Sequence, residues 1–149
     1  GKEAIREWEP HLIYVQGGNT FWLHHCMKKN DWYQDLINAC SCNSSSSIYC
    51  GVSAGAIIAG RFMQPACWKQ LDNPSVVPGR ETFDDWTDIL GLDITGGDSF
   101  FPHMQQHWEE MIVNQTRQLQ ESNGVTTLHC IQDSDAYVVN GRKRCVQKI

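Results

Sequence analysis

The residues most able to do chemistry lie in segment 51–55, Gly-Val-Ser-Ala-Gly. The segment fits the pattern G-x-S-x-G, in which a strained strand-to-helix turn holds a serine with its hydroxyl clear of the sheet. The flanking glycines let strand and helix pack closely, and the backbone N–H of Ala54 can donate to an oxyanion. The pattern predicts that Ser53 is a nucleophile. The alternative is a glycine-rich turn with an incidental serine.

A serine nucleophile needs a base, and the base needs an acid that orients it. Among the six histidines, His103 follows Phe-Pro at the end of an irregular segment, where a loop would enter a site. His11 begins a predicted strand, and His129 falls within another, so both are expected to be structural. His103 therefore lies where a base could reach the site.

The histidines do not predict a metal site. His24, His25 and Cys26 are adjacent on a predicted helix, and adjacent helix residues point in different directions. His103 and His107 could share a helix face, but no glutamate follows the first histidine as the metalloprotease motif requires, and no third ligand is evident.

These residues must be positioned by alternating strands and helices. Apolar and β-forming residues predict a buried strand over 11–15, and the turn Gly-Gly-Asn-Thr at 17–20 offers Asn19 or Thr20 as the cap of a helix. The remaining predictions are helices over 21–29, 31–40, 56–59 and 104–120, strands over 48–50, 125–131 and 136–139, a serine-rich loop over 41–47, an irregular region over 64–88 and a hairpin turn at 140–141.

This order of elements predicts an α/β sandwich with a mainly parallel sheet. In such sheets ligands gather at the carboxyl ends of the strands. Both glycine turns, at 17–18 and 51–55, follow predicted strands.

The composition indicates what broad class of protein this is. The chain has 149 residues, of which 41% are hydrophobic and 19% charged, which suits one domain with a packed core. The net charge of −5 disfavours nucleic acid as a partner, and no apolar run reaches the roughly 18 residues of a membrane span. Seven cysteines without a CxxC pair predict mostly reduced thiols in a cytoplasmic protein.

Three segments together, 14–21, 51–56 and 101–103, resemble peptidase family S51, the group of aspartyl dipeptidase (peptidase E) and cyanophycinase. The resemblance runs from about residue 5 to about residue 141. It implies a class I glutamine amidotransferase-like fold, a three-layer α/β sandwich, over a single domain 1–149. Family members have further strands before the one at Leu12, so we expect the chain to be N-terminally incomplete.

The resemblance also implies site residues. Ser53 matches the nucleophile and His103 the base, while the acid follows the late strand, where Asp133 is the closer match and Asp135 a rival. The N–H groups of Gly18 and Ala54 match the oxyanion hole.

Three more positions are implied to bind substrate. Arg117 has the spacing of an arginine that takes an acidic side chain, Asp72 resembles a residue that could hold an amino terminus, and Asn19 lies in the matching Gly-Gly-Asn-Thr segment. The expected function is hydrolysis of small peptides, such as dipeptides with N-terminal Asp, through an acyl-enzyme and without metal or organic cofactor. We expect a small peptide as the partner, no nucleic acid and no membrane, with a homodimer left open.

The sequence departs from the family pattern in places, and two other functions stay open. Gln16 stands where the family usually has glycine, Met104 replaces a usual aromatic residue, and the stretch after Gly60 matches poorly. One alternative is an inactive or truncated amidotransferase-like binding protein. The other is an α/β-hydrolase esterase, whose chain order would use Ser53, Asp98 and His129.

Overall fold

The computed structural model describes residues 2–40, 47–123, 127–140 and 145–149. The helices are α1 Lys2–Trp8, α2 Thr20–Lys29, α3 Trp32–Cys40, α4 Ala54–Ala59, α5 Pro65–Trp68 and α6 Glu109–Asn123. The strands are β1 Leu12–Val15, β2 Ile48–Gly51, β3 Ser99–Phe101, β4 Leu128–Cys130, β5 Tyr137–Asn140 and β6 Cys145–Lys148. Three single turns of 3₁₀ helix are η1 Pro74–Val76, η2 Phe83–Trp86 and η3 Gln106–Trp108.

The strands form two parallel pairs and one antiparallel pair. β1 pairs with β2, with Leu12 opposite Ile48, and β3 pairs in parallel with β4. β5 and β6 are antiparallel, with Asn140 opposite Cys145, while most of the predicted hairpin turn lies outside the described residues. The predicted α/β class with parallel strands is confirmed.

Most predicted elements form close to their expected positions. Asn19 caps α2, since its side-chain oxygen accepts a hydrogen bond from the backbone N–H of Trp22 at 3.0 Å. The long helix α6 begins at Glu109 rather than at residue 104, because the chain first makes the turn η3. The serine-rich loop lies mostly outside the described residues, as does the start of the predicted strand over 125–131.

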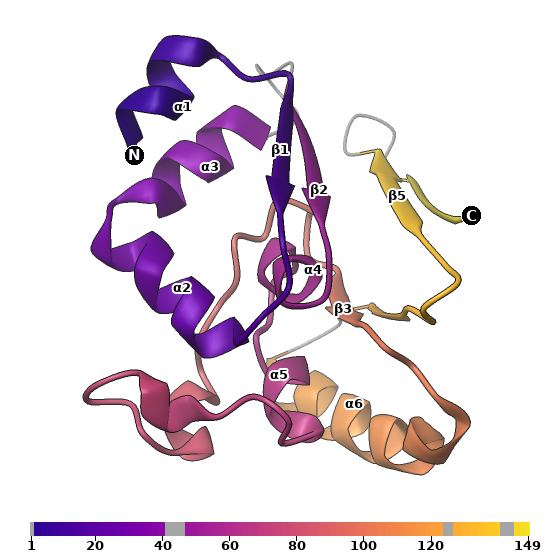
Figure 1. Cartoon of the computed structure of the whole chain (residues 1–149). Coiled ribbons are helices and arrows are strands. Elements are labelled where there is room, and N and C mark those ends of the chain that lie inside the picture. Colours follow the sequence, from indigo (N-terminus) through magenta and orange to yellow (C-terminus); the bar gives the residue numbers. More distant parts are fainter. Residues whose placement is uncertain (1, 41–46, 124–126, 141–144) are drawn as a thin grey trace.

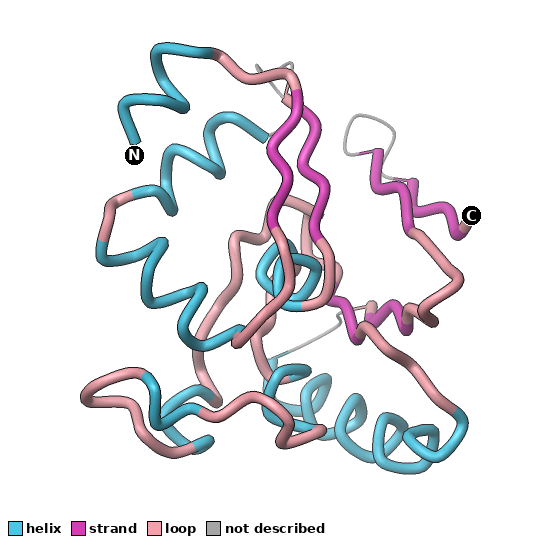
Figure 2. Tube along the Cα trace, in the orientation of Figure 1, coloured by secondary structure: helices cyan, strands magenta, loops and turns pink. Residues whose placement is uncertain are grey.

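Two regions differ from the expectation more strongly. The charged segment before β1 forms α1, which is tied to α3 by hydrogen bonds from the Arg6 guanidinium to Asp35 at 2.8 and 3.0 Å. The region between α4 and β3 is mostly loop, as predicted, but it contains α5 and two 3₁₀ turns (Figure 2).

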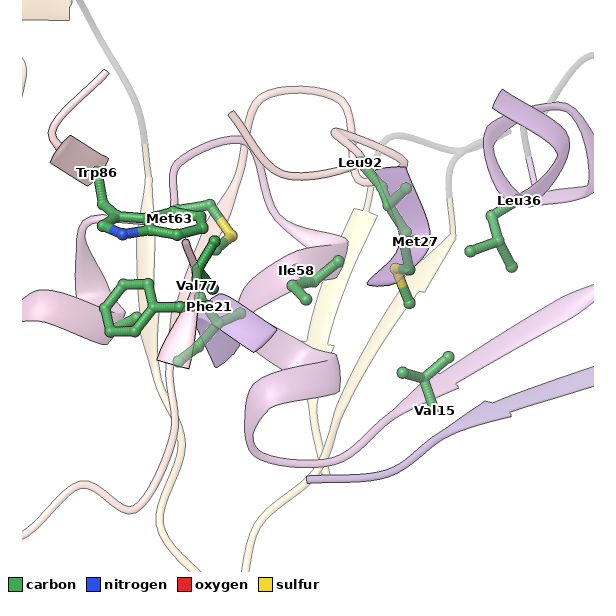
Figure 3. Packing of buried hydrophobic residues seen from close by; sticks show 11 residues of the cluster. Val15, Phe21, Met27, Leu36, Ile58, Met63, Val77, Trp86 and Leu92 are labelled. Atoms are coloured by element: carbon green, nitrogen blue, oxygen red, sulfur yellow. The ribbon is translucent and has the colours of Figure 1, made fainter. Parts of the chain in front are cut away.

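The core lies between β1–β2 and the helices that cover one face of this pair. In Figure 1, α1, α2 and α3 lie on one side of β1 and β2, and α4 follows β2 directly. Figure 3 shows Phe21 of α2 beside Trp86 of η2, and their ring centroids are 4.8 Å apart. Ile58 of α4 is fully buried in the same cluster, which thus joins α2 and α4 to the loop region.

The expectation of a buried strand over 11–15 was wrong for one face. Leu12, Tyr14 and Ile48 are 60%, 55% and 67% exposed, whereas Val15 is buried. Side chains alternate between the two faces of a strand, and in the described part of the chain the helices cover only the face that carries Val15.

None of the helices in the described ranges combines the length and apolar content that crossing a bilayer requires.

Candidate active site

Four loops meet where parallel strands end. Gly17 and Gly18 follow β1, Ser53 follows β2, His103 follows β3 and Asp133 follows β4. Because the strands of each pair run in the same direction, their following loops emerge at the same end, as expected for a ligand site in a parallel sheet.

The turn that carries Ser53 is strained and closely packed. Ser53 has φ 54° and ψ −111°, a backbone conformation that favours glycine and costs a serine energy. Gly55 permits the turn, since a Cβ at this position would overlap the carbonyl oxygen of Val15. A Cβ on Gly17 would lie 2.9 Å from the Cβ of Ser53. The two glycines therefore let β1, Ser53 and α4 approach closely.

Ser53, His103 and Asp133 form one hydrogen-bonded row. The Oγ of Ser53 lies 2.9 Å from Nε2 of His103, and Nδ1 of His103 lies 2.6 Å from Oδ1 of Asp133. The side chains of His103 and Asp133 are 47% and 74% exposed. A molecule from solvent can therefore reach the row, and the order is that of a nucleophile, a base and an orienting acid.

Backbone contacts fix the loop that carries His103. His103 has φ 54°, and the N–H of the following residue, Met104, donates to the carbonyl oxygen of Ile131 at 2.8 Å. This bond ties the loop after β3 to the end of β4, close to Asp133.

Lys69 is a neighbour of the row that the sequence did not predict. Its Nζ donates to the carbonyl oxygen of Pro102 at 2.6 Å, directly before His103. Burial lowers the pKa of Lys69, while the nearby carboxylates of Asp72 and Asp133 act in the opposite direction. Its position in an irregular region, without a motif, gave no signal in the sequence.

The neighbouring carboxylate of Asp135 has another partner. Its Oδ2 lies 2.7 Å from Nζ of Lys148, and this hydrogen-bonded ion pair holds the pKa of Asp135 below its usual value. The structure thus brings Asp133, and not Asp135, to His103.

A second acid–histidine pair lies nearby without joining the row. Nε2 of His129 lies 3.1 Å from Oδ2 of Asp98, the two residues that an esterase of the α/β-hydrolase type would use. Ser53, however, has His103 as its partner. The order Ser53–Asp98–His129 is therefore not assembled around the serine.

The comparisons with known proteins agree with this architecture. The sequence model of peptidase family S51 matches residues 2–146. The chain belongs to peptidase family S51. No curated protein sequence matches at a significant level.

Among solved structures, a crystal structure of a Listeria monocytogenes EGD-e protein, named provisionally as a peptidase E, resembles this S51 chain. The TM-score is 0.62 and the sequence identity 19%, over 99% of this chain and 62% of the other. The likeness establishes the fold, in line with the expected glutamine amidotransferase-like class. The S51 chain thus spans less than two thirds of that protein's length.

Two of the residues expected to bind substrate in this S51 chain, Asp72 and Asn19, make hydrogen bonds within the protein. Oδ2 of Asp72 accepts hydrogen bonds from the N–H and Oγ1 of Thr20 at 2.9 and 2.6 Å, which places Asp72 beside the turn that contains Gly18. Asn19 caps α2 and donates from Nδ2 to the carbonyl oxygen of Asn73 at 2.9 Å. Both therefore hold the loop after β1 against the segment around Asn73.

Arg117 is an exposed side chain on α6. Within the described ranges, no recorded hydrogen bond or ion pair links Arg117 to another of the predicted site residues. Gly18 has φ 135°, and nothing lies within 4 Å of where its Cβ would be, so the space beside the proposed oxyanion hole is open.

Proposed function

We propose that this chain is a serine peptidase that hydrolyses small peptides, with dipeptides that begin with Asp as the first candidates. The observation that carries the proposal is the row of hydrogen bonds that joins Ser53, His103 and Asp133. Membership of a peptidase family supports the same class of reaction.

The acylation step follows from the geometry. Asp133 accepts the Nδ1–H of His103, which leaves the lone pair on Nε2 facing the Ser53 hydroxyl. His103 takes the hydroxyl proton while Oγ of Ser53 attacks the carbonyl carbon of the peptide bond. The C–N bond then breaks, and the proton on Nε2 passes to the departing amine.

Water completes the reaction by attacking the acyl ester on Ser53. His103 takes a proton from the water, the C–O bond to Ser53 breaks, and the proton returns to Oγ as the acid product leaves. In both steps the carbonyl oxygen becomes negative. The backbone N–H groups of Gly18 and Ala54 are proposed to donate to this oxyanion, which preorganised donors stabilise strongly.

Substrate selection is proposed to rest on charge. Arg117 would form a forked pair with the acidic side chain of the substrate, and Asp72 would accept the free amino terminus. Asp72 is supported by its hydrogen bonds to Thr20, two residues after Gly18, whereas Arg117 rests on the family resemblance.

The test compares the chain with its Ser53→Ala variant. Purified protein is incubated with Asp-Leu, and with Ala-Leu as a matched substrate without the acidic side chain, and the released leucine is quantified. We expect Asp-Leu to be hydrolysed faster than Ala-Leu, and Ser53→Ala to lower kcat by about 10⁶-fold, the loss typical of a serine nucleophile. Equal rates for both proteins would refute the catalytic role of Ser53.

A further inference from the structure

A cavity lies away from the hydrogen-bonded row. It has a volume of about 650 Å³ and is lined by α2, α3 and the segment 77–93. The lining includes His24 and Lys28 of α2, Tyr33 of α3, Arg80 and Trp86. The residues of the row do not line it.

Two buried nitrogen atoms in this cavity lack a hydrogen-bond partner. His24 is 6% exposed, and neither its Nε2 nor Nη1 of Arg80 has an acceptor or donor among the described residues. Burying a polar atom without a partner is costly, so proteins rarely do it without a ligand, a water or a functional reason. His24 and Arg80 both line the cavity, so a small rotation of either side chain would turn its unpartnered nitrogen toward a molecule bound there.

Two cationic side chains of the cavity each lie over an aromatic ring. Nζ of Lys28 lies 3.4 Å from the ring centroid of Tyr33, and Cζ of Arg80 lies 5.3 Å from that of Trp86. The ring of His24 stands between them, 5.5 Å from Tyr33 and 5.6 Å from Trp86. A cation over an aromatic face is attracted to it, so both positive groups are preorganised around His24.

The charges that reach His24 are all positive. Burial lowers the pKa of His24, and the positive charges of Lys28, Arg80 and His25 act in the same direction. Together they bring the pKa to about 4, although the backbone of Leu90 acts in the opposite direction. His24 is therefore neutral at pH 7. Because Nε2 of His24 has no partner in the described part of the chain, the hydrogen bond to the Leu90 backbone involves Nδ1. Nδ1 therefore carries the proton, and Nε2 is left as an acceptor.

Two carboxylates also line the cavity but lie at its exposed side. Asp88 and Asp93 are both exposed, and Oδ1 of Asp93 accepts the N–H of Gly97 at 2.8 Å. Neither is among the groups that shift the pKa of His24 or of Lys28. The charged groups that act on His24 and Lys28 are thus positive, while Asp93 acts on Tyr33.

We propose that this cavity binds a small carboxylate that has a large apolar body and a hydrogen-bond donor on the carbon next to the carboxylate, as in a 2-hydroxy or 2-amino acid. Arg80 and Lys28 donate to the carboxylate, and Nε2 of His24 accepts from the neighbouring hydroxyl or amino group. The apolar body lies against the side chains of Ile37, Val77, Trp86, Ile89, Leu90 and Leu92.

Calorimetric titration of the chain with L-3-phenyllactate and with L-phenylalanine tests the proposal. It also distinguishes a 2-hydroxy acid from a 2-amino acid as the ligand. We expect one of them to bind with 1:1 stoichiometry, and Arg80→Met and Lys28→Met each to weaken it at least tenfold, because each removes a charge-assisted hydrogen bond. Lys29→Met is the matched control, since Lys29 is the next residue of α2 and does not line the cavity.

Two analogues test the individual contacts. The corresponding amide of the bound acid, which lacks the negative charge, should bind at least tenfold more weakly. 3-Phenylpropanoate, which lacks the donor, should also bind more weakly. The titration is repeated with Ser53→Ala, which keeps the cavity and removes the proposed nucleophile, so that the result does not depend on catalysis.

The absence of binding by either acid to the folded chain would overturn the proposal. So would equal affinity for the acid and its amide, or an equal loss of affinity in Lys29→Met. Thermal unfolding of each variant verifies that it is folded. Lys28 is exposed, so Lys28→Met keeps the test decisive even where Arg80→Met does not fold.

Discussion

Two aspartates that follow β4 take different partners, and this difference favours one of them as the acid of the proposed triad. Asp133 lies within hydrogen-bond distance of Nδ1 of His103, at 2.6 Å, whereas Asp135 is held in the ion pair with Lys148. An acid that fixes the tautomer of the base must contact the base directly. At the scale of single residues, Asp133 is therefore the proposed acid.

Replacing Asp133 with Asn should keep the geometry but favour the wrong tautomer of His103. We expect kcat for Asp-Leu to fall by about 10⁴-fold, as such changes do in Ser-His-Asp triads. Asp135→Asn and Asp98→Asn are the matched controls and should stay within a few-fold of the original rate. If Asp98→Asn abolished activity instead, the esterase-type arrangement would be the correct one.

Lys69 is predicted to position His103 rather than to touch the substrate. Lys69→Met removes the hydrogen bond to the carbonyl oxygen of Pro102, so the loop that carries His103 loses a tether. We expect kcat to fall about tenfold, the effect of one charge-assisted bond, with KM for Asp-Leu unchanged. Lys69→Arg should recover part of the rate. A rise in KM alone would assign Lys69 to substrate binding instead.

The sequence singled out Ser53 and His103, which the structure brings together, whereas the contact of Lys69 was not predictable. Ser53 stands in a motif whose glycines have a steric purpose, and His103 follows a recognisable Phe-Pro pair. Lys69 meets Pro102 only through the folding of an irregular region onto β3, and no local pattern encodes that contact.

At the scale of elements, the approach of α4 to β1 depends on Gly55. Its Cα faces the carbonyl of Val15, where a methyl group has no room. The strained turn at Ser53 can persist only while this contact holds the strand and the helix together.

Gly55→Ala should therefore affect both stability and activity. Forcing a methyl group into a packed site typically costs about 1–3 kcal/mol, and the shift of α4 should also lower kcat by more than tenfold. Urea denaturation and the Asp-Leu assay measure the two effects. Gly79→Ala is the control, because Gly79 has φ 80° but open space around it. The Gly79→Ala variant should keep its kcat, and a similar loss of kcat in both variants would contradict the packing argument.

The burial of His24, whose ring packs against Tyr33 and Trp86, predicts a pH-dependent stability. Its pKa of about 4 in the folded chain lies below the usual histidine value of 6.5, so as pH falls below 6.5 the unfolded chain takes up a proton that the folded chain resists. The free energy of unfolding should fall by roughly 3 kcal/mol between pH 7 and pH 4 from this residue.

Urea denaturation at pH 7, 6, 5 and 4 measures this loss. In His24→Gln the part of the pH dependence that His24 causes should vanish, whereas His25→Gln should keep it. An unchanged pH dependence in His24→Gln would show that other groups cause the acid sensitivity.

Element boundaries were predictable where a local signal existed. Asn19 marks the start of α2 because its side chain caps the helix. By contrast, α1 has no clear apolar periodicity, and its place depends on the long-range pairing of Arg6 with Asp35. The turns within 64–88 likewise depend on packing around Trp86 rather than on local propensity.

At the scale of the whole molecule, one face of the β1–β2 pair remains apolar and exposed in the described structure. Leu12, Tyr14 and Ile48 lie on it, and exposed apolar patches of this kind favour association. The alternation of side chains in these strands was predictable, but the exposure of this face was not, since it depends on which elements cover the sheet.

We predict that the purified chain self-associates through this face. Sedimentation velocity over a range of concentrations should show an increase in mean mass, and Tyr14→Lys should shift that increase to higher concentration. Leu71→Lys is the control, because Leu71 is 75% exposed and lies in a loop away from these strands. An equal effect of both substitutions would argue that general charge, and not this face, controls association.

The central claim, that Ser53 is an activated nucleophile, is tested most directly by covalent labelling. The folded chain is treated with a fluorophosphonate, which reacts with activated serines, and the adduct is located by peptide mass spectrometry. We predict one adduct per chain, on Ser53, that disappears in Ser53→Ala and is strongly reduced in His103→Ala. Folded protein that takes up no label, or that carries it on another residue, would contradict the account.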